Sequence, residues 1–226
     1  MKIHFVSPLL ILIGIMPTGK VVVSLSIPIL LLTIIFALWL RYEIIKSNRQ
    51  DKLRNQSFWH KEKQANSVRR RDISDLDYIT LELDRLPLKD HEDDTINSYR
   101  DTITALSDRK IVNLTGLTNT ELKLQYGTAN IDLLAEYDSN YTKLVSILHK
   151  WGERLYNRGN VSDATAVLEY AVSCHTDAVK TYRLLAAIYK EQNTPDKINH
   201  LIAMIPNTKM LRKDTLIREL NQLKDS

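Results

Sequence analysis

The chain has 226 residues, a formal net charge of +4 at pH 7 and one cysteine. This length leaves room for a membrane segment and one folded domain of about 120–150 residues, and it excludes two large soluble domains. A single cysteine excludes an intrachain disulfide, which fits a reducing compartment and argues against a secreted, cross-linked scaffold.

Charge is distributed unevenly along the chain. Residues 41–71 contain ten Lys and Arg against three Asp and Glu, whereas from residue 72 onward there are nineteen against twenty-four. The basic pI therefore comes from residues 41–71, a juxtamembrane linker that we call the basic collar. It does not predict that the rest of the chain binds nucleic acid.

Two apolar stretches open the sequence. Residues 3–16 are largely apolar, and after a turn at residues 17–20 the stretch 21–40 carries no charge. A helix of about 20 residues is about 30 Å long, which matches the hydrocarbon core of a bilayer. We expect residues 1–40 to form a membrane anchor, either a transmembrane helical hairpin or a single span. A cleaved signal peptide is the alternative, but no small-x-small cleavage site follows.

The basic collar predicts the orientation of this anchor. The positive-inside bias places the C-terminal side in the cytoplasm, so the expected localisation is the cell membrane with the folded domain facing the cytoplasm. Three roles for the collar stay open: it fixes topology, it binds anionic lipid, or Arg69–Arg71 bind nucleic acid. Three arginines are a weak signal, and no nucleic-acid partner is expected. The candidate lipid contacts are Arg41, Lys46, Arg49, Lys52 and Arg54.

Residues 72–226 predict one helical domain. At its start, Asp77–Leu86 alternates Ile79, Leu81 and Leu83 with polar residues, which is the period of a half-buried strand. Because no partner strand is evident, the alternative is an extended arm laid across the helices.

Three helices are predicted before the most regular part of the sequence. A helix over about 93–107 begins with acidic residues, which oppose the helix dipole. Thr118 and Glu121 have the spacing of a capping box at the start of a second helix. Apolar residues at three- and four-residue steps predict an amphipathic helix over Ile131–Tyr156.

Large and small residues then recur at fixed spacings in two successive sets. Gly152 and Ala186, for example, are thirty-four residues apart. The first set is Leu148, Trp151, Gly152, Leu155, Gly159, Ala164, Leu168 and Ala171, and the second is Tyr182, Leu185, Ala186 and Tyr189. In these residues the chain resembles the tetratricopeptide repeat (TPR), a 34-residue helix–turn–helix unit.

This resemblance implies a mainly α fold with TPR-like units at about 145–178 and 179–212. The sequence departs from the pattern at Thr176, where a proline is usual, and at Ile198, where a small residue is usual. Repeats of this kind need flanking neighbours to bury their faces. We expect the helix over 131–145 and another over 211–223 to cap the two ends.

The resemblance also implies a groove, lined by the first helices of successive units, that takes peptides. The candidate groove residues are His149, Glu153, Tyr156, Lys180, Arg183 and Lys190. One interpretation is a groove for an acidic or carboxylate-ended segment of a partner. The other is a solvated helix face, on which such charges are ordinary.

Catalytic and metal-binding patterns are weak. Asp90–Asp94 contains four acids and a histidine, but adjacent residues cannot all point at one ion. Cys174 and His175 have no evident third group to orient a nucleophile. We therefore identify no catalytic, cofactor-binding or metal-binding residue, and no cofactor is expected.

These observations together predict a membrane-anchored protein-binding or scaffolding module. It would recruit a protein or peptide partner to the cytoplasmic face of the membrane through its TPR-like domain. Two alternatives remain: a structural subunit of a larger membrane assembly, and an enzyme whose site is assembled from residues remote in sequence.

Overall fold

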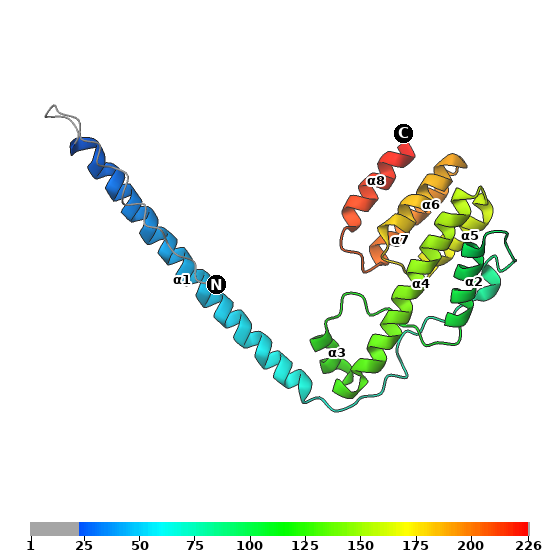
Figure 1. Cartoon of the computed structure of the whole chain (residues 1–226), viewed down its shortest axis with the longest axis horizontal. Coiled ribbons are helices and arrows are strands. Elements are labelled where there is room, and N and C mark those ends of the chain that lie inside the picture. The colour runs from blue at the N-terminus through cyan, green and yellow to red at the C-terminus, as the bar shows by residue number, and fades with distance from the viewer. Residues whose placement is uncertain (1–22, 226) are drawn as a thin grey trace. The chain divides into compact units, whose positions relative to one another are not determined.

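The structure is a computed structural model that describes residues 23–225, with side chains described from residue 29 (Figure 1). The predicted segment 3–16 and the turn after it lie outside the described residues. The chain divides into two units, Met1–His60 and Lys61–Ser226, which are described separately.

The first unit contains most of α1, which runs from Val23 to Asn66. This helix continues without a break from the apolar stretch into the basic collar, so apolar and charged residues share one element. Among the described residues, no helix combines the length and the apolarity that crossing a membrane requires. The prediction of a transmembrane hairpin or single span is therefore wrong for the described part of the chain.

The division between the units falls inside the collar, not at its end. Glu62, in the last turns of α1, accepts a 2.7 Å hydrogen bond from the Thr120 hydroxyl and forms an ion pair with Lys123. Ala65 is fully buried. The last residues of α1 therefore belong to the second unit, where they contact residues about sixty positions later, and the local charge pattern did not predict these contacts.

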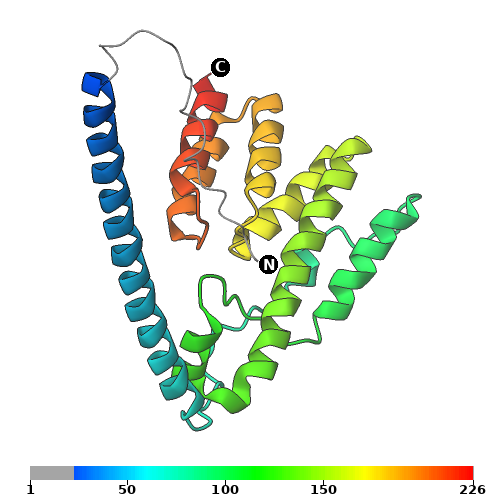
Figure 2. The ribbon, with the colours of Figure 1, turned by 60° about the vertical axis from the view of Figure 1, so that its left-hand side comes forward.

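The second unit is mostly helical, as expected from the sequence. Its described helices are α2 (Asp94–Leu106), α3 (Asn119–Tyr126), α4 (Ile131–Asn157), α5 (Val161–Ser173), α6 (Val179–Glu191), α7 (Pro195–Met204) and α8 (Lys213–Asp225). Single 3₁₀ turns lie at Leu83–Arg85, Thr128–Asn130 and Ile205–Asn207. The long helix α4 lies between α2 on one side and the helices α6 to α8 on the other (Figure 2).

Local capping explains where two of these helices begin. The Asp93 carboxylate accepts a hydrogen bond from the Thr95 amide and caps α2. Thr118 and Glu121 form the predicted capping box at the start of α3. The predictions of a helix near 93–107 and of this capping box are confirmed.

Three successive helices end in the same kind of turn. After α4, α5 and α6 the chain takes a positive φ at Gly159 (82°), His175 (56°) and Asn193 (53°). The residue following each turn donates its amide to a carbonyl five residues earlier, at 2.9, 3.4 and 2.9 Å. This is the Schellman arrangement, which satisfies carbonyls that a helix end leaves unpaired. The first of these turns uses a glycine, whereas the other two form without one.

The helices repeat at a constant interval. α5 begins at Val161 and α7 at Pro195, while α6 begins at Val179 and α8 at Lys213, and each pair differs by 34 positions. The amphipathic helix predicted over Ile131–Tyr156 is confirmed as α4, so the stretch 131–145, expected to act as a cap, is the first half of this helix. The N-terminal half of α4 therefore extends the first hairpin instead of forming an independent cap.

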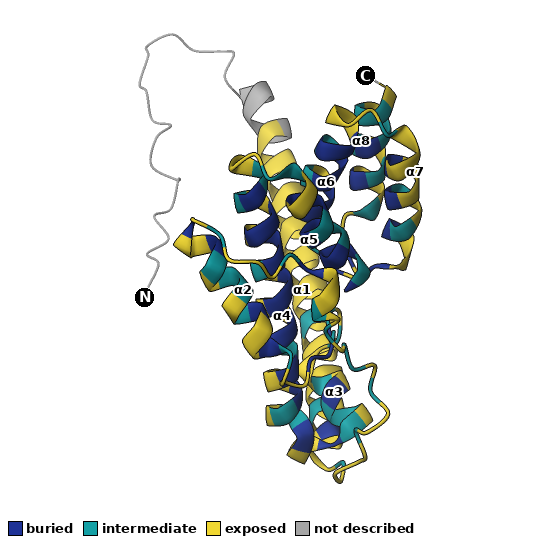
Figure 3. Cartoon of the chain, turned by 90° about the vertical axis from the view of Figure 1, so that its right-hand side faces the viewer, coloured by how far each residue is buried: buried dark blue, intermediate teal, exposed yellow. Residues whose placement is uncertain are grey.

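Close packing between α4 and α5 depends on a small residue. A Cβ atom placed on Gly152 would lie 2.6 Å from Cγ of Leu168, which is far inside van der Waals contact. The neighbouring Trp151 and Leu168 are fully buried. Buried residues (dark blue in Figure 3) follow the inner sides of α4, α5 and α6. The absent side chain thus allows the two helices to approach and close the core.

The alternating segment before α2 is an arm, which we define as residues 77–90, and it is irregular apart from the 3₁₀ turn at Leu83–Arg85. It makes a single β-bridge between Tyr78 and Val112, and Ile79, Leu81 and Leu83 pack against the main core. The Glu82 amide donates a 2.7 Å hydrogen bond to the Tyr170 hydroxyl on α5. The two-residue period therefore predicted the buried side correctly, and the arm alternative describes the segment better than a strand.

Candidate functional site

Three side-chain contacts join α4 and α6, the helices expected to line a groove, and α8, the helix expected to cap one end. Nδ1 of His149 lies 3.3 Å from Oγ1 of Thr181, and the Tyr156 hydroxyl donates a 2.6 Å hydrogen bond to Glu191. Arg183 donates through Nε and Nη2 to the two carboxylate oxygens of Glu219, at 2.9 and 3.0 Å. The partners lie 32, 35 and 36 positions apart, so each contact joins two different helices of the second unit.

His149 lies inside this array instead of on its surface. Its side chain is buried between α4 and α6, where it faces Thr181. Burial disfavours the charged imidazole and lowers the pKa of His149. His149 therefore packs two helices together, and it does not present itself to a partner as the sequence suggested.

The other five candidate groove residues do reach the surface. Glu153, Lys180, Arg183 and Lys190 are exposed, and Tyr156 is half-buried. The hydrogen bond to Glu191, and then burial, raise the pKa of Tyr156. Because Arg183 and Tyr156 already have partners within the chain, Lys180 and Glu153 are the charged groups best placed to meet another molecule.

The predicted lipid-contacting residues all lie on the exposed surface of α1. Lys46 forms an i,i+3 ion pair with Glu43 at 3.7 Å, and Arg54 pairs with Asp51. Such exposed pairs contribute little to stability. The residues concerned, all exposed, are Arg41, Lys46, Arg49, Lys52 and Arg54.

Two of the three arginines that follow in the collar have structural partners. Nε of Arg70 donates to the Asn130 side chain at 3.1 Å, and Arg71 donates its amide to the Tyr126 carbonyl at 3.0 Å. These contacts hold the chain between α1 and the arm against the loop after α3. They give two of the three arginines contacts within the chain.

An apolar cavity that the sequence did not predict lies between α5, α6 and α7. Its volume is about 460 Å³, within the range of small-molecule and peptide pockets. Buried Val172, Leu185 and Leu201 line it together with Met204. Arg85 of the arm contributes to its rim. No sequence motif predicts this cavity, because its lining residues come from four separate segments, which are the arm and the helices α5, α6 and α7.

A small polar network lies at the edge of this cavity. Glu169 accepts hydrogen bonds from the Tyr189 hydroxyl at 2.7 Å and from Nζ of Lys197 at 3.1 Å. Nζ of Lys197 also lies 5.1 Å from the centre of the Tyr189 ring. Burial and the bond to Glu169 raise the pKa of Tyr189, which keeps its phenol neutral. The carboxylate of Glu169 is thus engaged within the chain.

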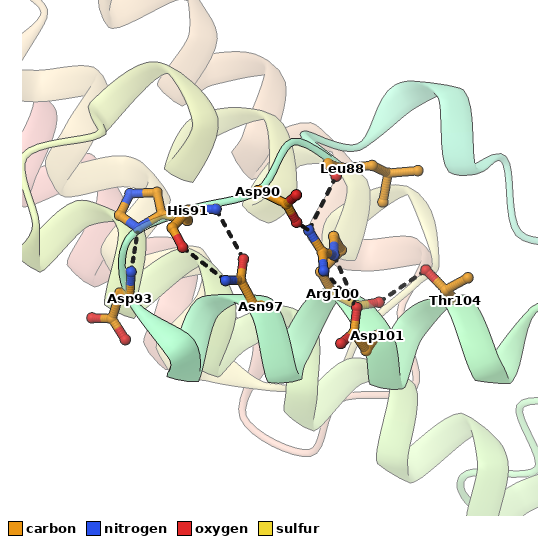
Figure 4. Close-up of polar contacts among 8 residues, drawn as sticks. All are labelled: Leu88, Asp90, His91, Asp93, Asn97, Arg100, Asp101 and Thr104. Carbon is orange, nitrogen blue, oxygen red and sulfur yellow. Dashed lines mark hydrogen bonds and ion pairs between the residues drawn. The ribbon is translucent and has the colours of Figure 1, made fainter.

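The acidic loop before α2 is explained by internal contacts (Figure 4). Asp90 forms an ion pair with Arg100, and the Asn97 side chain exchanges two hydrogen bonds with the backbone of His91, at 2.9 and 2.7 Å. Asp93 caps α2, as described above. Among the described residues no set of three or more His, Cys, Asp or Glu side chains is arranged to hold a metal ion. The loop thus has a structural role.

The cysteine is also part of the packing. Cys174 is 6% exposed, and burial raises the pKa of its thiol to about 11. A thiol of such high pKa is a poor nucleophile at neutral pH.

Comparison with protein-family models, curated proteins and solved structures gave no match for this chain.

Proposed function

We propose that the second unit, Lys61–Ser226, is a protein-binding module that holds a segment of a partner against the face formed by α4, α6 and α8. The observation that carries this proposal is the set of three contacts between these helices at intervals of 32 to 36 positions. They hold α4 against α6 and α6 against α8. A surface built from repeated helices suits an elongated partner.

The charges of this face suggest the chemistry of the partner. Lys180 is exposed on α6, one turn before Arg183, whose guanidinium is already bound to Glu219. An incoming carboxylate meets Lys180 directly but has to compete with Glu219 for Arg183. We therefore expect an acidic or carboxylate-ended segment to bind at Lys180, as the TPR resemblance implies.

Site-specific crosslinking in the full chain tests this proposal. A photo-reactive amino acid at Lys180 or Glu153 should crosslink to the same partner peptide, which mass spectrometry identifies. The same group at Arg109, an exposed residue beyond the end of α2, should not. Crosslinking that is equal at all three positions would count against a defined face.

A charge reversal gives the matching affinity test. Lys180→Glu should weaken binding of the identified peptide by about tenfold, because an attraction becomes a repulsion. Arg109→Glu makes a similar change elsewhere and should leave binding unchanged. If Lys180→Glu lowered the melting temperature along with the affinity, Lys180 would be structural and the proposed contact would be lost.

A further inference from the structure

The basic residues that α1 carries between positions 41 and 54 are of two kinds. Lys46 is paired with Glu43, and Arg54 is paired with Asp51, each acid lying three positions before its partner. The exposed cations that form no ion pair with any described residue are Arg41, Arg49 and Lys52. The five residues expected to contact lipid therefore divide into two neutralised cations and three uncompensated ones.

The three uncompensated cations lie on one side of α1. The segment is a single helix (Figure 1), so successive residues point in directions that differ by about 100°. At this spacing the three cations point within about 80° of one another. All four residues of the two ion pairs point about 110° or more away from the middle of that sector. Between positions 41 and 60, one side of the helix is thus cationic and free of acids.

Two apolar side chains project from the same side. Ile45 and Trp59 point into the sector of the three cations, and their exposed fractions are 58% and 66%. We call this surface the cationic side, and it consists of Arg41, Ile45, Arg49, Lys52 and Trp59. Cations interleaved with an indole ring and an aliphatic chain suit the headgroup region of a bilayer, where phosphate and the ends of the acyl chains meet.

The residues before Arg41 distinguish a bilayer from other polyanions. Leu38, Trp39 and Leu40 immediately precede it, and all three are exposed. A nucleic acid would neutralise the cations but leave this apolar surface in water, whereas lipid can cover it. Charge and apolarity together therefore favour an anionic bilayer as the ligand.

We propose that α1 binds the surface of an anionic lipid bilayer through its cationic side. The contact involves one side of the helix and does not require a helix that crosses the membrane. It is independent of the function proposed for the face formed by α4, α6 and α8.

Two double variants that remove the same charge test the choice of side in the full chain. Arg41→Gln with Lys52→Gln should weaken binding to phosphatidylserine vesicles by about tenfold, because both cations lie at the lipid surface. Lys46→Gln with Arg54→Gln should weaken it by less than about threefold at physiological salt, because these positions face away and are screened. Equal weakening would mean that only net charge matters, and would overturn the proposal.

Fluorescent labels on two glutamines test whether the contact is one-sided. Gln56 points into the cationic sector and Gln50 points roughly opposite, and both are exposed. In a Cys174→Ala background, an environment-sensitive dye on Gln56→Cys should shift its emission to the blue with phosphatidylserine vesicles. The same dye on Gln50→Cys should not. Equal shifts at the two positions, or no shift at either, would overturn the proposal.

A nucleic acid is the competing ligand for the cationic side. Single-stranded RNA, added in excess over the exposed lipid phosphate, should leave the chain bound to phosphatidylserine vesicles in a cosedimentation assay. Displacement of the chain into the supernatant would show that RNA is the preferred ligand, and would overturn the proposal.

Discussion

The Asp93 carboxylate accepts hydrogen bonds through Oδ2 from Nε of Arg154 and Nε of Arg158, both at 2.8 Å. This contact joins the first residue before α2 to the end of α4, across more than sixty positions of sequence. The same carboxylate caps α2 through the Thr95 amide. One side chain therefore caps the start of α2 and also holds it against the end of α4.

Removal of this carboxylate should destabilise the domain. The hydrogen bond from Arg154 comes first among the effects that hold the pKa of Asp93 well below its usual range. Asp93→Ala removes both the cap and the ion pairs, and should lower the melting temperature by about 2–8 °C. Asp93→Asn keeps a capping side chain but loses the charge, so it should lie between the wild type and Asp93→Ala. Circular dichroism melting measures both.

The stability that Asp93 contributes should depend on pH. Its pKa is lowered in the folded state, so this contribution is present above the unfolded value, about 3.9, and is lost as the pH falls from there toward the folded value. Urea unfolding at pH 7, 5 and 3 should show a smaller difference between wild type and Asp93→Asn at the lowest pH. A difference that stayed constant would mean that the charge of Asp93 does not matter.

Gly152 should not tolerate a side chain. In Gly152→Ala the new Cβ would lie 2.6 Å from Cγ of Leu168, so α4 and α5 must separate or Leu168 must move. We expect a loss of about 1–3 kcal/mol in the free energy of unfolding, as for other overpacked cores. Gly152→Ala should lower the free energy of unfolding less in the Leu168→Ala protein than in the wild type, because the side chain that the new Cβ meets is then shortened. Urea unfolding of the four proteins measures the coupling.

Gly159, in contrast, should accept asparagine. Its φ is 82°, but no atom lies within 4 Å of the position of an added Cβ. Asn193 holds the same turn after α6 with φ 53°. Gly159→Asn should therefore cost less than Gly159→Val, because a β-branched residue is strained at positive φ. Equal melting temperatures for the two variants would contradict this account of the turn.

Cys174 should be unreactive in the folded chain. Its thiol is buried and its pKa is raised to about 11, so little thiolate forms at pH 8. Labelling with Ellman's reagent should be slow in buffer and should reach one thiol per chain in urea, since the sequence contains one cysteine. Rapid labelling without denaturant would show that the end of α5 opens readily.

Binding of anionic lipid by the basic collar remains a prediction from the sequence. Each basic residue near such a surface contributes about 1 kcal/mol, so Arg49→Glu with Lys52→Glu should reduce cosedimentation with phosphatidylserine vesicles. Binding to phosphatidylcholine vesicles serves as the control for contacts that do not involve charge. Equal loss with both lipids would count against an electrostatic contact.

The sequence by itself determined the elements whose signals are local. Acidic residues near position 93 and the capping box of Thr118 and Glu121 predicted helix starts, and the alternation in the arm identified its buried side, because each feature depends on a few neighbouring residues. The interval of 34 positions was likewise readable from recurring large and small residues.

Only the tertiary structure decided what these elements contact. It buried His149 against Thr181, engaged Arg183 with Glu219, and assembled a cavity from Arg85 and three helices. It also corrected the transmembrane anchor, because no described helix has the length and apolarity required to cross a membrane. Contacts between residues thirty or more positions apart depend on how helices cross, and periodicity along one helix does not contain that information.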